Sequence, residues 1–91
     1  GVPVNDAEAV KWYRLAADQG DAFAQAMLGV MYDNGDGVPQ DYVQAHMWAN
    51  LAAAQGNEDA RGARDVIAFM MTPSQIEEAQ RLAREWLAAH P

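Results

Sequence analysis

The sequence predicts an all-α fold: an α-α superhelix, that is, a right-handed solenoid of antiparallel helical hairpins with about five helices. An internal repeat is the first observation behind this prediction. Gly1-Val2-Pro3 returns 36 residues later as Gly37-Val38-Pro39. A fixed period of about 20 to 50 residues is the signature of a repeat array. The same spacing relates Ala9 to Ala45, Trp12 to Trp48, Leu15-Ala16-Ala17 to Leu51-Ala52-Ala53, Gln19-Gly20 to Gln55-Gly56, and Ala24 to Ala60.

Composition and helix-end signals are the second and third observations. The chain is rich in alanine, leucine, methionine and glutamine, and it contains a single threonine and a single serine. This composition favours helices over strands. Each helical segment follows an asparagine, aspartate or threonine that can cap a helix, and two segments close on a glycine. Short glycine connections between helices imply antiparallel hairpins.

The first predicted helix spans about residues 6–18. Asn5 can cap it, and Glu8 three residues later completes a capping-box pattern. Gly20 is placed to end the helix in a left-handed conformation. Apolar residues at spacings of three and four predict the stripe that faces the core. That stripe consists of Ala9, Trp12 and Ala16, flanked by Tyr13 and Leu15.

The second predicted helix, about residues 22–33, is capped by Asp21 and carries Gly29 in its interior. A glycine there costs roughly 1 kcal/mol relative to alanine, so we expect a neighbouring helix to approach closely at this point. The following Asp33-Asn34-Gly35-Asp36-Gly37 is a tight turn of residues that tolerate positive φ. The core stripe consists of Ala24, Leu28 and Tyr32, widened by Met27 and Met31.

The third predicted helix repeats the first. Asp41 caps it, Gln44 repeats the capping-box position, and Gly56 closes it. Its core stripe of Ala45, Trp48 and Ala52 has the spacing of the first stripe.

The last two predicted helices end the array. The fourth, about residues 58–71, has Arg64-Asp65 where the repeat has Leu28-Gly29. The fifth, about residues 73–89, starts with Pro73 after a Thr72 cap. An apolar stripe and a charged outer face suit a solenoid cap. The stripe is Ile76, Ala79, Leu82, Ala83 and Trp86, and the outer face carries Glu77, Arg81 and Glu85.

We therefore interpret residues 1–91 as one solenoid segment. It divides into the second helix of a truncated repeat (1–20), one complete repeat (21–56), a degenerate terminal repeat (57–71) and a C-terminal capping helix (72–91). Because the chain starts inside a repeat, we expect it to be a fragment of a longer array.

Charge and composition exclude several classes of function. The net charge of −7 argues against nucleic acid and against anionic membrane surfaces. No cysteine is present, so disulfides and thiolate metal sites are excluded. No apolar run approaches the roughly 20 residues of a membrane span. The sequence shows no signal-peptide pattern, and it leaves cytoplasmic, periplasmic and secreted locations open.

Candidate chemical sites have simpler structural interpretations. Residues 33–44 resemble a calcium loop, but Gly35, Val38 and Gln44 stand at its third, sixth and twelfth positions. Asp36 and Asp41 are interpreted as turn and cap residues rather than an acid–base pair. We therefore expect no catalytic residue, no metal site and no cofactor. His46 and His90 lie on different helices, and Trp12, Trp48 and Trp86 have the spacing of core residues.

The repeat resembles the Sel-one-like repeat (SLR) family, relatives of the tetratricopeptide repeats. The resemblance covers the chain up to about Ala60 and holds twice in register. Trp12-Tyr13 becomes Trp48-Ala49 in the second copy, and Arg64-Asp65 departs from the pattern. The matching pattern is Ala24-x-x-x-Leu28-Gly29-x-x-Tyr32-x-x-Gly35-x-Gly37-Val38-x-x-Asp41-x-x-x-Ala45-x-x-Trp48, then Ala52-Ala53-x-Gln55-Gly56.

The resemblance implies a function. Members of the family, mostly bacterial in number, are adaptors that bind partners on a concave surface lined by the first helix of each pair. We therefore expect a protein–protein interaction scaffold that binds a protein or peptide. By analogy with tetratricopeptide geometry, the partner-binding residues are Phe23, Val30 and Asp33 and, one repeat later, Val66, Phe69 and Met70. The apolar ones could instead pack against the terminal helix.

Two other readings and one further expectation remain. The chain could be a hydrolase acting on cell-wall material, or an accessory domain of one, in which case ionisable groups should converge in one cleft. It could also be a structural fragment that contacts only copies of itself. We further expect a homodimer through the amino-terminal edge, with Val10 and Tyr13 as the exposed apolar contacts.

Overall fold

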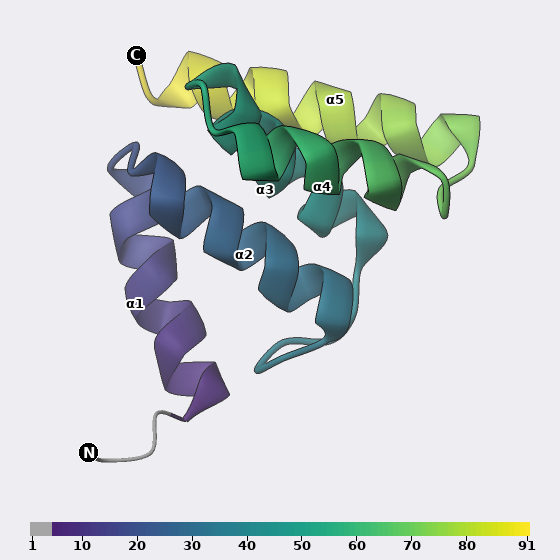
Figure 1. Cartoon of the computed structure of the whole chain (residues 1–91). Coiled ribbons are helices and arrows are strands. Elements are labelled where there is room, and N and C mark those ends of the chain that lie inside the picture. Colours follow the sequence, from purple (N-terminus) through teal and green to yellow (C-terminus); the bar gives the residue numbers. More distant parts are fainter. Residues whose placement is uncertain (1–4) are drawn as a thin grey trace.

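The computed structural model describes residues 5–91 and confirms the all-α prediction (Figure 1). The turn expected at Gly1-Val2-Pro3 lies outside the described residues. Five helices and no strand make up the described part of the chain. The helices are α1 (Asp6–Asp18), α2 (Ala22–Asn34), α3 (Tyr42–Ala54), α4 (Glu58–Ala68) and α5 (Pro73–Ala89).

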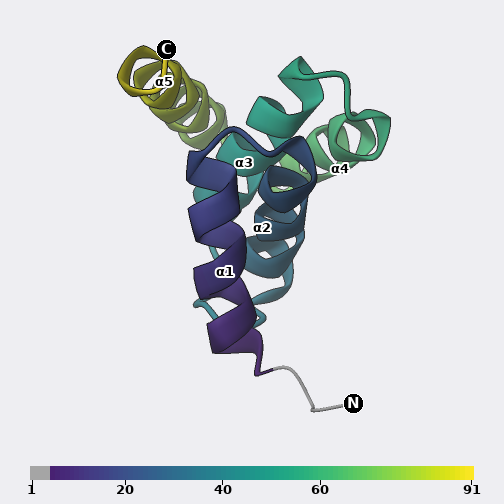
Figure 2. The same cartoon turned by 90° about the vertical axis from the view of Figure 1, so that its left-hand side faces the viewer.

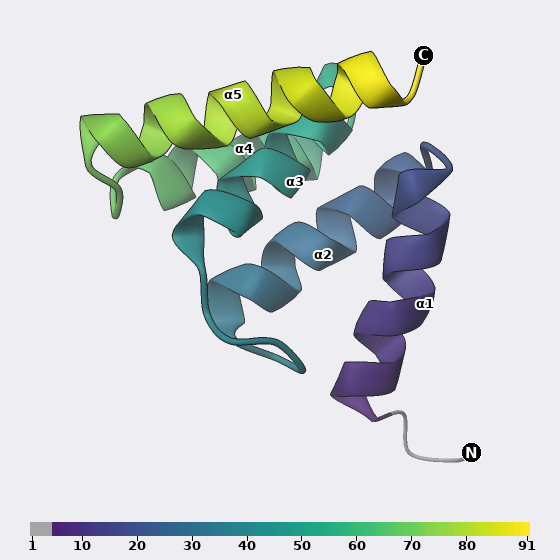
Figure 3. The same ribbon diagram turned by 180° about the vertical axis from the view of Figure 1, so that it is seen from behind.

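The helices form two layers. Consecutive helices from α1 to α4 pack against each other, whereas α5 packs against α3. Seen from the side, α2 and α4 lie on one side of the molecule, and α5 lies on the other, with α3 between α4 and α5 (Figure 2). Figure 3, from behind, shows α1 and α5 in front of α2 and α4. The face formed by α2 and α4 is therefore not covered by the terminal helix.

The helix starts are set by local hydrogen bonds. The side chain of the residue before each helix accepts a backbone N–H of the first turn, which satisfies a donor that the helix itself cannot. A complete capping box joins Thr72 and Gln75, with bonds of 2.9 and 3.2 Å. At the predicted boxes of α1 and α3, the described bonds are those that Asn5 and Asp41 accept. The cap residues are Asn5, Asp21, Asp41, Asn57 and Thr72.

The helix ends correct two predictions. Helix α2 runs one residue further than predicted, to Asn34, before Gly35 turns left-handed with φ of 75°. Helix α4 stops at Ala68, three residues short of the predicted Met71. The N–H groups of Phe69 and Met70 bond the carbonyls three residues back, which tightens the end into a turn. Thr72 is extended because it precedes Pro73, so the helix has to end before this residue and the chain turns there.

The core is centred on α3. Trp48 is fully buried, and its ring meets the Trp86 ring of α5 edge-on, with centroids 6.1 Å apart. The guanidinium of Arg14 from α1 lies 5.3 Å from the centroid of the same ring. Three helices therefore meet at one tryptophan. The core cluster consists of Ala17, Ala24, Leu28, Met47, Trp48, Leu51 and Ala83.

The predicted core position of Trp12 is wrong. Its side chain is 63% exposed. Helix α1 packs through Val10, Tyr13 and Ala17 instead, because these side chains face the core cluster that α2, α3 and α5 complete. The stripe of α1 is therefore rotated by about one residue from the prediction.

The expectation for Gly29 is confirmed. A β-carbon there would lie 3.2 Å from the carbonyl oxygen of Ala45 and 3.3 Å from the amide nitrogen of Ala49. Helix α3 thus packs directly on the backbone of α2, and the missing side chain is what allows it.

Helix α5 is amphipathic as predicted. Ala79 and Ala83 are buried, and Leu82 and Trp86 pack on the core cluster. On its outer side Arg81 donates to both carboxylate oxygens of Glu85, at 2.9 and 3.0 Å. Within residues 5–91 none of the helices combines the length and apolarity that crossing a bilayer requires.

Candidate partner-binding face

The α2–α4 face is defined here by the six predicted partner-binding residues. Its five apolar side chains are exposed, and Phe69 is the most open at 89%. The alternative that they pack against the terminal helix does not hold, because α5 packs on α3. Asp33 is half-buried. The six residues are Phe23, Val30 and Asp33 on α2, Val66 near the end of α4, and Phe69 and Met70 in the turn that follows α4.

The repeat places equivalent side chains on this face. Val30 and Val66 are 36 residues apart and both are exposed. Phe23 is held by an edge-on contact with the Tyr13 ring, at 6.3 Å between centroids and 61° between planes. Such pairs contribute about 0.5–1.5 kcal/mol beyond the area that they bury. The face thus combines repeated apolar positions with an aromatic residue that contacts Tyr13 of α1.

The charge of this surface is acidic. Asp33 lies in the last turn of α2, and Glu58 and Asp59 lie in the first turn of α4. Arg64 is drawn away toward α3, where it donates to the Asn50 oxygen at 3.0 Å while also bonding Asp65 at 3.0 Å. Arg61 of α4 is also exposed, so the surface offers mainly, and not only, carboxylates to a partner.

Beneath the face lies a buried histidine. His46 of α3 is only 4% exposed, and burial lowers its pKa from the usual 6.5. The nearby charge of Arg64 lowers that pKa further, and Asp65 acts in the opposite direction. His46 is therefore neutral at pH 7, and within the described residues its Nδ1 atom has no hydrogen-bond partner.

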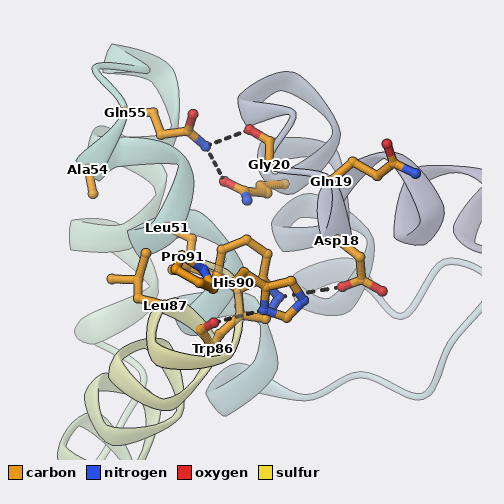
Figure 4. A pocket seen from close by; sticks show the side chains of 11 residues that line it. Asp18, Gln19, Gly20, Leu51, Ala54, Gln55, Trp86, Leu87, His90 and Pro91 are labelled. Atoms are coloured by element: carbon orange, nitrogen blue, oxygen red, sulfur yellow. Dashed lines mark hydrogen bonds between the residues drawn. The ribbon is translucent and has the colours of Figure 1, made fainter.

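A cavity of about 550 Å³ lies on another side, where α1, α3 and α5 end (Figure 4). It was not predicted, because its lining comes from the ends of separate helices and forms no sequence motif. In Figure 4, Gln55 reaches across to Gly20, with a bond of 2.9 Å to its carbonyl oxygen. Gln55 also donates to the buried Gln25 at 2.8 Å. These bonds join the helix ends.

The ionisable residues of this cavity are Asp18 and His90. Asp18 accepts from the indole N–H of Trp86 at 3.4 Å, and the Nδ1 atom of His90 lies 2.8 Å from the Trp86 carbonyl oxygen. The His90 ring also stacks on Trp86 at 3.9 Å between centroids. Both groups are thus engaged with Trp86, and they form no carboxylate pair of the kind that acid–base hydrolysis uses.

The outer surface of α1 differs from the expected dimer edge. Val10 and Tyr13 are half-buried and pack against the core cluster. The exposed apolar side chains of this helix are instead Trp12 and Leu15. The expectation that Val10 and Tyr13 form the exposed contacts is therefore wrong. The apolar stripe of α1 is rotated by about one residue from the prediction, which buries these two side chains and exposes Trp12.

Metal ligands do not gather in the described residues. No group of three or more histidine, cysteine, aspartate or glutamate side chains is close enough there to hold an ion. Asp36 and Asp41 flank a turn in which Gly37 has φ of 75° and its β-carbon position lies 2.5 Å from the backbone of Asp6. This turn packs against the start of α1.

Comparisons with known proteins agree with this architecture. The model of the Sel1 repeat matches residues 1–21 and 22–57. In solved structures, the chain resembles the protective antigen c5321 of uropathogenic Escherichia coli, which displays an SLR fold. The TM-score is 0.89 and the identity 32%, over 93% of this chain and 18% of that one.

Two curated proteins show the same similarity in sequence. Chitin synthase regulator SKT5 of Malassezia restricta is 37% identical over 65% of this chain and 4% of its own length. DAP3-binding cell death enhancer 1 of Rattus norvegicus is 36% identical over 64% of this chain and 11% of its own length. The chain thus spans a small part of the proteins that it matches.

Proposed function

Because this chain belongs to the Sel1 repeat family, we propose that it is a non-catalytic scaffold module that binds a protein or peptide partner through its α2–α4 face. Repeats of this family form helical modules for protein interaction. The observation that carries the proposal is the exposure of Phe23, Val30, Val66, Phe69 and Met70 on or next to α2 and α4, the two helices that lie on one side of the molecule. Clusters of exposed apolar side chains often mark sites of protein interaction.

The similar proteins support a partner of this class. One is named for binding another protein, and another for regulating an enzyme. The net charge of −7 disfavours nucleic acid as the ligand. A concave arrangement of the α2–α4 face in a longer array is part of the same proposal.

The alternative function, a hydrolase or its accessory domain, is less well supported. Its place would be the cavity between Asp18 and His90. Both side chains already contact Trp86, and two of the carboxamides that line the cavity, Gln25 and Gln55, bond each other. The arrangement favours a role in joining helix ends over acid–base chemistry.

Selection from a library of short random peptides tests the proposal. Peptides enriched on the wild-type chain are measured by fluorescence anisotropy against the double variant Val66→Glu, Phe69→Glu. We expect binding to weaken by about tenfold or more, because each glutamate adds charge and removes an apolar contact. The matched control is Leu87→Glu on α5, which changes an exposed apolar residue on the other layer and should leave binding unchanged.

Two results would contradict this function. The first is a library that yields no peptide binding above an unrelated helical protein. The second is a set of peptides that bind the double variant as tightly as the wild type.

A further inference from the structure

Gly62 is a glycine that the fold does not explain. It lies in the middle of α4, where glycine is a poor helix former. A β-carbon built there would meet no atom within 4 Å outside the neighbouring backbone of its own helix, among the residues described. Neither a left-handed conformation nor packing inside the chain therefore accounts for the missing side chain.

Gly29 shows what a helical glycine does elsewhere in this chain. Its position faces Ala45 and Ala49 of α3, with the Ala49 β-carbon 3.4 Å from the position of the missing side chain. Two small residues spaced i, i+4 on one helix thus pack against the bare backbone of another. Close helix approach of this kind needs small residues on both sides.

Gly62 lies on the exposed side of α4. Val66 and Phe69 follow it at four and seven residues, which places the three on one side of a helix. Val66 and Phe69 are exposed, while Ala60 and Ile67 form the buried side. In Figure 1 this helix lies in front of α3 and α5. An open glycine therefore lies between the acidic first turn of α4 and the exposed apolar residues Val66 and Phe69.

The charge along this side of α4 is divided. Glu58 and Asp59 stand in its first turn, four and three residues before Gly62, and both are exposed. Arg64 is turned toward Asn50 on α3 and pairs with Asp65, whereas Arg61 is exposed about 100° around the helix from Gly62. The apolar end is formed by Val66 and Phe69. A second copy of this chain, with a net charge of −7, is a poor match for the acidic end.

We propose that the α4 surface around Gly62 binds an α-helix of a partner protein that has small residues at i and i+4 over Gly62. Lysine or arginine side chains of that helix meet Glu58 and Asp59, and its apolar side chains meet Val66 and Phe69. This rests on the proposed function, and it makes Gly62 a specificity-determining residue for the partner.

The inference predicts that one substitution, Gly62→Ala, stabilises the chain but weakens partner binding. Gly62→Ala should raise the melting temperature by about 4–8 °C, because alanine is the better helix former and has open space there. The same change should weaken binding by about tenfold or more, since the added methyl group keeps the partner helix away. Gly29→Ala is the matched control for stability, and it should lower the melting temperature.

The probe is a synthetic amphipathic helical peptide with lysines at one end, alanines at i and i+4 in the middle and leucines at the other end. Its affinity for the wild type and for Gly62→Ala is measured by fluorescence anisotropy. Two altered peptides serve as controls: one replaces the central alanines by leucine, and one replaces the lysines by glutamate. Both should bind the wild type at least about tenfold more weakly.

The inference is overturned if Gly62→Ala binds the peptide as tightly as the wild type, or if Gly62→Ala lowers the melting temperature. In that case, if the double variant Val66→Glu, Phe69→Glu still weakens binding of the peptides selected from the library, the proposed function stands and only the helix-binding inference fails. If the double variant has no effect either, both fail.

Discussion

Trp12 and Trp48 occupy the same position of the 36-residue repeat, yet Trp48 is fully buried and Trp12 is 63% exposed. Trp48 is enclosed because α1 supplies Arg14 on one side and α5 supplies Trp86 on the other. Within the described residues Trp12 has no such neighbours. Burial in this fold therefore depends on the adjacent helices of the array and not on the repeat sequence alone.

The two tryptophans should differ sharply in their contribution to stability. Trp48→Ala is expected to lower the free energy of unfolding by about 3–5 kcal/mol, as for large aromatic residues removed from cores. Trp12→Ala should change it by about 0.5 kcal/mol or less, as for exposed sites. Chemical denaturation followed by circular dichroism measures both. Equal effects of the two substitutions would contradict the packing described.

Stability should fall on mild acidification because of His46. Burial first, and then Arg64, lowers its pKa in the folded state below the ordinary 6.5, while Asp65 partly offsets this. Above about pH 6.5 the histidine is neutral in both states and its contribution to stability is complete. As the pH falls from 6.5 toward the folded-state pKa, the unfolded chain takes up the proton first and stability is lost.

The measurement is the free energy of unfolding between pH 7.5 and 5 for the wild type and for His46→Gln. The variant should lose less stability than the wild type over this window, because the same carboxylates titrate in both proteins. Identical pH profiles would show that His46 is not the responsible group.

Self-association through α1 should depend on Trp12 and Leu15. These are the apolar side chains that the helix exposes, whereas Tyr13 packs on Phe23. We expect a symmetric dimer, because pairing of like edges closes on itself. Light scattering over a concentration series should show a dimer for the wild type and a monomer for Trp12→Glu. A dimer that survives Trp12→Glu, or a monomer at high concentration, rejects this edge.

The helix starts could be predicted to the residue because their causes are local. Asn5, Asp21, Asp41, Asn57 and Thr72 each bond the first turn of the helix that they precede. The end of α4 was harder to predict, because Met70 and Met71 carry no signal that ends a helix. The turn there is imposed by Thr72, which is extended because it precedes Pro73.

Burial and exposure depend on contacts between helices and were predicted less well. The register of the repeat identified the side of α2 and α4 that carries Phe23 and Val66, but their exposure depends on α5 packing against α3. Trp12 was misplaced for the same kind of reason. Gly62 could have been found from the sequence, because it interrupts a helical segment where the preceding repeat has Ala26.

The central claim is that a protein partner binds the α2–α4 face, and mapping of backbone amides by NMR tests it most directly. Spectra of the isotopically labelled chain are compared with and without a peptide enriched on the wild type. The account predicts shifts concentrated at the α2 and α4 residues around Phe23, Val30, Gly62 and Val66, with small changes in α1 and α5. Shifts centred on Trp12, or on the cavity beside Asp18 and Trp86, would contradict it.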